Sequence, residues 1–217
     1  MRESILSPFD RADIAARAAV TSSDAAAIVA RSYKSATWYA GELSALYTVS
    51  NNSRIIAIPG TKREIGEWLL DFDAMPILDR DLGICHRGFR NGAWELYRRS
   101  PLTAHDFAGS VIVGHSLGGA LALLLAAICV FIQQPPRAVV TFGAPRCGSW
   151  KLRRLLRRVP LRLYRNGDDP VPDVPWLPGL YLHPRALIPI GAPAFDPLAD
   201  HPIAAYQRAL AGGKETC

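Results

Sequence analysis

Residues 111–122 contain the pattern that most restricts how this chain can fold. An apolar run at 111–113 is followed by Gly-His-Ser-Leu-Gly-Gly at 114–119 and then by a long uncharged stretch. A short apolar run bounded by glycine is typical of a buried strand, and the uncharged stretch is typical of a buried helix. The sequence therefore predicts a strand that turns sharply at Ser116 into a helix, with glycines where the two elements pass closely.

A serine on such a turn is in a position to act as a nucleophile. The turn holds the hydroxyl exposed at the end of a strand, which is the arrangement of a nucleophile elbow. The start of the following helix adds N–H groups and a positive dipole where an oxyanion would form. A glycine-rich turn without function can carry the same pattern by chance, but the strand before Ser116, the uncharged helix after it and the extra Gly119 favour a nucleophile.

Along the rest of the chain, segments with the pattern of a strand alternate with segments with the pattern of a helix. Strands are expected at 54–58, 111–114, 138–142 and 161–164, and helices at 10–33, 90–98, 117–132, 149–159 and 202–210. An amphipathic segment is expected at 64–72, and an edge hairpin at 181–190, where Pro184 and Pro189 interrupt the pattern. Alternation of strands and helices predicts parallel strands joined by right-handed crossovers, hence a three-layer α/β sheet.

Composition narrows the class of protein. With 217 residues and 49% hydrophobic content the chain can bury a full core, so one domain over 1–217 is expected, with 1–35 as an N-terminal helical extension. The net charge of +6 comes from scattered arginines without a nucleic-acid-binding motif, so no nucleic acid partner is expected. The four cysteines lack paired metal spacing and are expected to be free thiols, without a metal site.

Two stretches of the sequence bear on where the protein is found in the cell and on whether it crosses a membrane. Charged residues interrupt 1–35, so no apolar core of a secretory signal is recognisable there, and we expect a cytoplasmic protein with peripheral membrane contact left open. The uncharged run 116–136 begins at the elbow and contains glycines and glutamines, so it is expected to be a buried helix and no transmembrane segment is predicted. The sequence makes no prediction of oligomeric state.

An elbow serine needs an acid and then a histidine later in the chain. The loop after the strand 161–164 carries Asp168 and Asp169, and either carboxylate could orient the base or simply cap the turn. Only His183 and His201 follow this loop. His183 lies in a strand-like stretch bounded by prolines, whereas His201 precedes the last helix in a loop, so His201 is favoured as the base.

Four ordered blocks carry a resemblance to a known family. They are Gly114 to Gly119, Thr141-Phe-Gly-Ala-Pro-Arg146, Asp169-Pro-Val-Pro172, and Asp200-His201 with Tyr206. Together they resemble the class 3 lipases, the fungal-type triacylglycerol lipases and their bacterial relatives, over about residues 50 to 210. The resemblance implies an α/β-hydrolase fold and hydrolysis of lipid esters. It also implies that the acid is Asp169, because the family pattern begins there.

The resemblance further implies how the remaining site is built. Ile58-Pro-Gly-Thr61 resembles the family's oxyanion strand, with proline in place of the usual arginine, so the N–H groups of Thr61 and Leu117 are expected to bind the oxyanion. A Ser116–His201–Asp169 triad needs no metal or organic cofactor. The expected substrate is a lipid or another ester. Phospholipase, thioesterase and acyltransferase activities on the same fold remain alternatives, as does a non-catalytic lipid-binding domain.

Two segments outside the triad are candidates for contact with lipid. Residues 62–76 are expected to form a lid, or else an ordinary surface helix packed on the core. The substrate-contacting or lid residues expected are Ile65, Trp68, Leu69 and Phe72, together with His115. The helix at 149–159 has leucines on one face and basic residues on the other, for which a solvated face is favoured and attraction to anionic lipids is the alternative. These basic residues are Lys151, Arg153, Arg154, Arg157 and Arg158.

Overall fold

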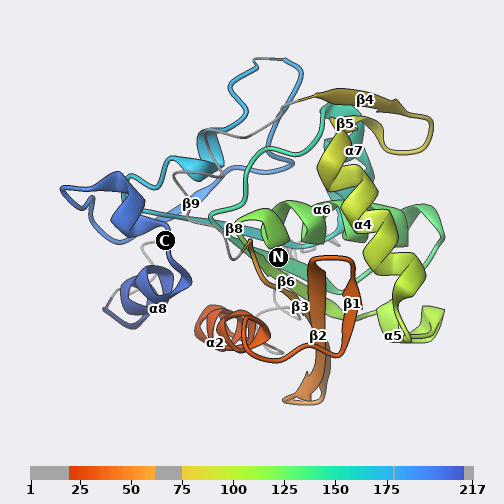
Figure 1. The fold of residues 1–217 in the computed structure, drawn as a ribbon, viewed down its shortest axis with the longest axis horizontal. Helices are drawn as coiled ribbons and strands as arrows, with labels where there is room; N and C mark the ends of the chain where they lie inside the picture. Colours follow the sequence, from red (N-terminus) through yellow and green to blue (C-terminus); the bar gives the residue numbers. More distant parts are fainter. Residues whose placement is uncertain (1–19, 62–74, 178, 213–217) are drawn as a thin grey trace, which may run out of the picture.

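The computed structural model describes residues 20–61, 75–177 and 179–212, which form a seven-stranded sheet between layers of helices (Figure 1). The strand order across the sheet is β1-β2-β3-β6-β7-β8-β9. The strands are β1 (Trp38–Ala40), β2 (Leu43–Ser50), β3 (Ser53–Ile58), β6 (Val111–His115), β7 (Ala138–Phe142), β8 (Leu161–Asn166) and β9 (Ile188–Ile190). The expected three-layer α/β architecture with a mostly parallel sheet is confirmed.

The direction of the strands changes once across the sheet. From β3 to β9 every neighbouring pair is parallel, whereas β1, β2 and β3 pair antiparallel. The β2–β3 hairpin turns at Asn51 and Asn52, which both have positive φ (48° and 58°). Two successive left-handed residues are the requirement of a type I′ hairpin turn, and asparagine tolerates this conformation better than most residues.

Alternate residues of the central strands face two separate cores. On β3, Ile56 and Ile58 belong to the larger core and Ile55 and Ala57 to the smaller one, and all four are buried. The larger core is covered by α4, α6 and α7, and the smaller one by α2 and α8 (Figure 1). These helices are α2 (Ser22–Ser32), α4 (Arg87–Arg99), α6 (Leu117–Phe131), α7 (Trp150–Leu155) and α8 (Ile203–Gly212). A sheet buried on both faces explains why its strands read as continuous apolar runs.

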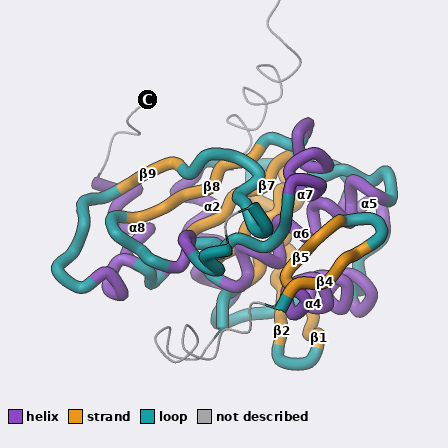
Figure 2. Tube along the Cα trace, turned by 90° about the horizontal axis from the view of Figure 1, so that it is seen from above, coloured by secondary structure: helices purple, strands orange, loops and turns teal. Residues whose placement is uncertain are grey.

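Smaller elements lie around the sheet. They are the antiparallel strands β4 (Pro76–Asp79) and β5 (Gly83–His86), α5 (Ala104–Phe107), and the 3₁₀ turns η1 (Leu156–Arg158), η2 (Val171–Asp173) and η3 (Pro197–Asp200). The β4–β5 hairpin lies beside α4 and α7, apart from the main sheet (Figures 1 and 2). Of the helices in the described ranges, none combines the length and the apolar character that crossing a bilayer requires.

Several sequence-based expectations need correction. Residues 181–190 do not form an edge hairpin: only Ile188–Ile190 is a strand, and it pairs parallel with β8. The helix expected at 149–159 ends as an α-helix at Leu155 and continues as one 3₁₀ turn. The sequence reading missed β1, β2, β4 and β5. The amphipathic segment 64–72 and the first part of the helix 10–33 lie outside the described residues.

Candidate active site

Ser116 lies in a strained turn between β6 and α6. Its φ of 53° and ψ of −128° are rare for a residue with a side chain. The turn is tight enough that a Cβ on Gly114 would overlap the backbone of Gly118, and a Cβ on Gly118 would overlap the carbonyl oxygen of Ile58. Glycine is therefore required at both positions. The Ser116 N–H donates to the carbonyl of Phe142 on β7 at 2.9 Å, which ties the turn to the sheet.

The structure brings His201 and Asp169 together from two loops. His201 Nδ1 lies 2.8 Å from Asp169 Oδ2 and 2.9 Å from Oδ1, and both side chains are buried. Asp169 also accepts hydrogen bonds from the Tyr206 hydroxyl at 2.6 Å and the Val171 N–H at 2.9 Å. Burial opposes ionisation of Asp169, but these donors, with His201 the strongest, hold its pKa below the usual value. The carboxylate is thus ionised beside the imidazole.

The two aspartates that the sequence left open differ in environment. The Asp168 side chain is exposed, and its backbone N–H donates to Asp200 Oδ2 at 3.0 Å. Only Asp169 contacts His201. Similarly, His183 Nε2 lies 2.7 Å from the carbonyl oxygen of Pro172, while His201 lies beside the elbow. The geometry therefore favours the same acid and the same histidine that the sequence favoured.

Asp200 holds the histidine loop against the acid loop. Its buried carboxylate accepts from the N–H groups of Asp168 and Ala194, each at 3.0 Å, and its carbonyl accepts from Asn166 Nδ2 at 3.0 Å. His201 follows directly, so its backbone position is set by contacts to the end of β8. The sequence reading did not assign a role to Asn166, because nothing in its local pattern indicates a partner 34 residues later.

His115, expected from the sequence to contact substrate, is buried beside His201. It is 4% exposed, its Nε2 lies 2.8 Å from the carbonyl oxygen of His201, and its ring centroid lies 4.8 Å from that of His201. Burial, and then the neighbouring His201, lower the pKa of His115 to about 3, so the ring is neutral near neutral pH. A buried polar ring needs hydrogen-bond partners on both nitrogens. One partner of His115 is the backbone of His201, so His115 supports the loop that carries His201.

The second nitrogen of His115 bonds to Tyr33. The Tyr33 hydroxyl lies 2.5 Å from His115 Nδ1 and accepts from the Gly60 N–H at 2.9 Å. Burial raises the pKa of Tyr33 to about 12, so the hydroxyl keeps its proton and can donate it to Nδ1. Because a neutral imidazole has one donor, Nε2 then donates to the carbonyl of His201. A continuous chain of hydrogen bonds therefore runs from Gly60 through Tyr33 and His115 to His201.

Removing the Tyr33 hydroxyl is expected to impair both stability and turnover. Tyr33→Phe leaves the Gly60 N–H and His115 Nδ1 without their partner, which costs about 1–3 kcal/mol for each buried group left unsatisfied. Because the chain of bonds ends at the His201 backbone, we expect kcat for ester substrates to fall about tenfold under conditions where the variant stays folded. Steady-state kinetics and urea unfolding measure the two effects. Tyr39→Phe, at a side chain that is 67% exposed, is the matched control and should change neither.

The neutral state of His115 predicts a dependence of stability on pH. The unfolded chain takes up a proton at this residue below about pH 6.5, whereas the folded protein does so only near pH 3. The stabilisation is therefore complete above pH 6.5 and is lost as the pH falls toward 3, by up to about 1.4 kcal/mol per pH unit. Urea unfolding across this range should show a shallower slope for His115→Asn than for the unmodified chain. Equal slopes would contradict the assignment.

The residues expected to bind an oxyanion flank Ser116. Leu117 is the first residue of α6, so its N–H has no partner within the helix. Gly60 packs so closely that a Cβ there would lie 2.8 Å from Ser116 Cβ, which brings the segment leading to Thr61 alongside the serine. Thr61 and Leu117 also line one cavity of about 280 Å³, to which Tyr33 and Leu43 contribute as well. The expected lid residues Ile65, Trp68, Leu69 and Phe72 lie outside the described residues.

Two atoms at the centre of the site lack partners. Ser116 Oγ and His201 Nε2 are both buried, and neither has a hydrogen bond to any residue within 20–61, 75–177 or 179–212. Buried polar atoms without partners are rare and call for an explanation. These are the hydroxyl and the ring nitrogen between which a serine–histidine pair transfers its proton, so both remain available for a substrate.

The chain resembles known proteins in both sequence and fold. The family model for Lipase (class 3) matches residues 55–178, which include Ser116 and Asp169. The chain is 32% identical over 122 residues to Toxin TseL of Vibrio cholerae, an alignment that covers 54% of this chain and 19% of that protein. It is 29% identical over 153 residues to the secreted mono- and diacylglycerol lipase 1 of Fusarium solani, covering 63% and 44%. The chain thus spans less than half the length of these curated relatives.

A solved structure shows the same fold. The triacylglyceride lipase of Rhizomucor miehei superposes with a TM-score of 0.56 at 22% identity, over 69% of this chain and 61% of that one. At this level of identity the likeness establishes the arrangement of strands and helices. The seven-stranded sheet described above is therefore an α/β-hydrolase sheet, with Ser116 at its elbow.

Proposed function

Because the chain belongs to the class 3 lipase family, we propose that it hydrolyses the carboxylic ester bonds of lipids through an acyl-enzyme on Ser116. The observation that carries the proposal is the buried pair of His201 and Asp169, held beside a strained serine with His201 Nε2 left unpartnered. A neutral imidazole that is hydrogen-bonded to a carboxylate through one nitrogen, with its other nitrogen free next to an elbow hydroxyl, is the arrangement that makes a serine nucleophilic.

In the first half-reaction His201 Nε2 takes the proton of Ser116 as Oγ forms a bond to the ester carbonyl carbon. The carbonyl oxygen becomes an oxyanion, which the N–H groups of Leu117 and Thr61 would bind at a gain of about 3 kcal/mol per donor. Asp169 holds the imidazole in the tautomer with its proton on Nδ1 and stabilises the imidazolium. The C–O bond to the alcohol then breaks, and His201 gives its proton to the departing oxygen.

In the second half-reaction water replaces the alcohol. His201 Nε2 removes a proton from the water as its oxygen attacks the acyl carbon, and the resulting oxyanion collapses with loss of Ser116 Oγ. The proton returns to the serine, and a carboxylic acid is released. The chain of bonds from Gly60 to His201 supports both steps, since it connects the loop of an oxyanion donor to the loop of the base.

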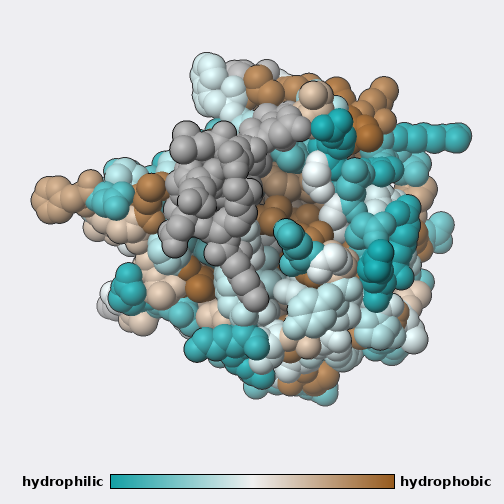
Figure 3. Space-filling model, viewed as in Figure 1, coloured by the Kyte–Doolittle hydropathy of each residue, from teal (hydrophilic) through white to brown (hydrophobic). Residues whose placement is uncertain are grey.

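The substrate class proposed is a glycerol ester of fatty acids, the class for which the Fusarium relative is named. An exposed apolar patch supports contact with a lipid surface: Leu78 is 79% and Met75 47% exposed on and beside β4. Hydrophobic colouring gathers over this hairpin at the upper edge of the view in Figure 3. Exposed apolar patches mark surfaces that contact proteins, membranes or ligands, and for a lipid hydrolase a lipid aggregate is the contact that we propose.

Labelling with a fluorophosphonate, followed by an activity panel, tests the proposal on the intact chain. An activated serine is expected to react quickly with the probe and to release fatty acid from mono-, di- or triacylglycerol emulsions. Absence of labelling would support a non-catalytic lipid-binding domain. Labelling with hydrolysis of only phospholipids or thioesters, or with acyl transfer to an alcohol, would replace the lipase proposal by one of the alternatives on the same fold.

A further inference from the structure

A second cavity lies at the end of the sheet opposite Ser116. It has a volume of about 1010 Å³ and is bounded by the residues just before β7 and β8, including Arg137 and Pro160, and by Val130 near the end of α6. Ser116, in contrast, follows β6 and precedes α6. Because β6, β7 and β8 are parallel, the starts of the strands and their ends lie on opposite edges. The cavity is therefore separate from the proposed catalytic site.

The lining of this cavity is strongly basic. It contains Arg137, Lys151, Arg154, Arg157 and Arg158, and no acidic residue is among the residues that line it. Lys151 Nζ is engaged with the carbonyl of Arg80 at 2.6 Å. Arg154, Arg157 and Arg158 are exposed and form no ion pair with a carboxylate in the part of the chain that the structure describes.

These three arginines repel one another. Arg157 and Arg158 follow Arg154 by three and four residues along α7 and η1, the spacings at which side chains on one helical face are neighbours. Like charges at these spacings destabilise a helix, and an anion between them would relieve the repulsion. Planar guanidinium groups bind phosphate oxygens in pairs, and a phosphomonoester carries between one and two negative charges, enough for two arginines.

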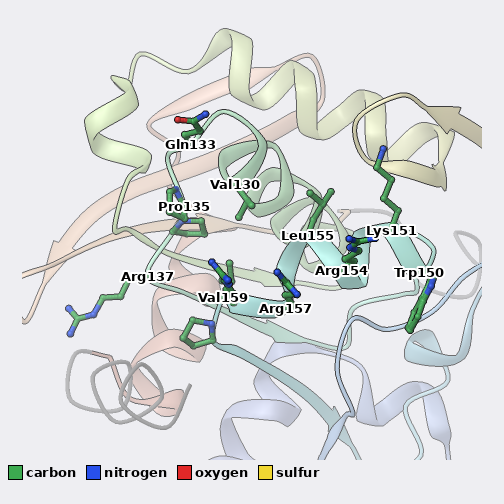
Figure 4. A pocket seen from close by; sticks show the side chains of 13 residues that line it. Val130, Gln133, Pro135, Arg137, Trp150, Lys151, Arg154, Leu155, Arg157 and Val159 are labelled. Carbon is green, nitrogen blue, oxygen red and sulfur yellow. The ribbon is translucent and has the colours of Figure 1, made fainter. Parts of the chain in front are cut away.

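The floor of the cavity is apolar. Val130, Leu155 and Val159 lie around Arg157 in the middle of the cavity, and Arg154 lies between Leu155 and Trp150, which is at one end, while Arg137 points away at the other end (Figure 4). Trp150 is 68% exposed, and the guanidinium of Arg153 lies 5.5 Å from its ring centroid. A ligand that carries only a phosphate would leave this apolar surface uncovered, whereas an alkyl chain attached to the phosphate would cover it.

We propose that this cavity binds a lipid with a phosphomonoester head group, the phosphate held by Arg154 and Arg157 and the alkyl chain lying on Val130, Leu155 and Val159. The lipid binds as a single molecule, because the site is concave. The proposal goes beyond ester hydrolysis and does not depend on it, since none of these residues belongs to the catalytic site.

Isothermal titration calorimetry with three probes tests the proposal on the full chain. Monododecyl phosphate, below its micelle concentration, has the proposed head group and chain but no carboxylic ester. Dodecylphosphocholine keeps the chain but has a zwitterionic head group, and inorganic phosphate lacks the chain. We expect saturable binding of monododecyl phosphate at one site, at least about tenfold tighter than either other probe. Equal binding of dodecylphosphocholine, or equal binding of inorganic phosphate, would overturn the proposal.

Matched variants assign the binding to this cavity. Arg154→Gln with Arg157→Gln is expected to weaken binding of monododecyl phosphate at least about tenfold, because it removes the two charge-assisted hydrogen-bonding contacts between guanidinium groups and the phosphate. Arg98→Gln with Arg99→Gln removes the same charge from two side chains of α4 that are 60% and 63% exposed and should leave the affinity unchanged. Trp150→Ala should weaken binding several-fold, because it removes apolar surface that the alkyl chain of the probe would cover.

The other possible results for the arginine variants also decide whether the proposal holds. Equal weakening by both arginine pairs would mean that net charge alone attracts the probe, and would overturn the proposal. A change of oligomeric state in the Arg154/Arg157 variant, seen by sedimentation without loss of probe binding, would assign the cavity to a second copy of the chain. Ester turnover by this variant should be unchanged, so that failure of this proposal and failure of the proposed hydrolase activity remain distinguishable.

Discussion

Ser116→Ala is expected to reduce ester turnover by about a millionfold, the cost found when a nucleophilic serine is removed from a comparable triad. Labelling by a fluorophosphonate should disappear with it. Stability should stay the same or rise slightly, because Ser116 Oγ forms no hydrogen bond within the described part of the chain and its loss removes a buried group without a partner. The strained backbone is equally strained with alanine.

Ser110→Ala is the matched control for this prediction. Ser110 lies immediately before the same strand, is fully buried, and donates its hydroxyl to the carbonyl of Phe107 at 2.8 Å. Its replacement should cost about 1 kcal/mol of unfolding free energy while leaving turnover intact. The two serine variants thus have opposite expected effects on activity and stability. More than a few per cent of residual activity in Ser116→Ala, measured with a soluble short-chain ester, would contradict the nucleophile assignment.

Asp169→Asn is expected to lower kcat about ten-thousandfold, because an amide that donates toward His201 favours the wrong imidazole tautomer. The change also weakens the bonds from Tyr206 and Val171, which the carboxylate accepts now. Asp168→Asn is the neighbouring control: its side chain is exposed, and only its backbone N–H contributes to the site. If Asp168→Asn were the more damaging change, the assignment of the acid would be wrong.

The same comparison applies to the two histidines. His201→Ala removes the base and should resemble Ser116→Ala in activity. His183→Ala removes the contact between His183 Nε2 and the Pro172 carbonyl, and should lower stability while leaving most activity. Far-ultraviolet circular dichroism separates loss of folding from loss of catalysis in both variants.

The central strands could be predicted from the sequence because each is a continuous apolar run between turn residues. This holds for β6 and β7, whose residues are all buried. It fails for β2, where Ser44, Thr48 and Ser50 alternate with apolar residues and only two of its eight residues are buried. The pair Asn51-Asn52 before β3 was nevertheless a usable indication of a tight hairpin, since both residues adopt positive φ.

The residues proposed for catalysis could be predicted from the sequence to different extents. Ser116 and the loop of Asp169 have local patterns, because a nucleophile elbow and a proline-stiffened loop impose their own residue types. The contact of Tyr33 with His115 joins residues 82 positions apart, and no local pattern records it. It follows only from the packing of the chain after α2 against the sheet, which gives both ring nitrogens of His115 partners within the fold.

The helix α6 has a consequence for how the molecule would sit on a surface. Ser116 caps its start and Val130 lines the basic cavity near its end, so the two sites are separated by a rod of 15 residues, about 22 Å long. On a negatively charged support the protein would adsorb through the arginine end. The edge of the sheet that carries the elbow would then face the bulk solution, so immobilised molecules would share one orientation.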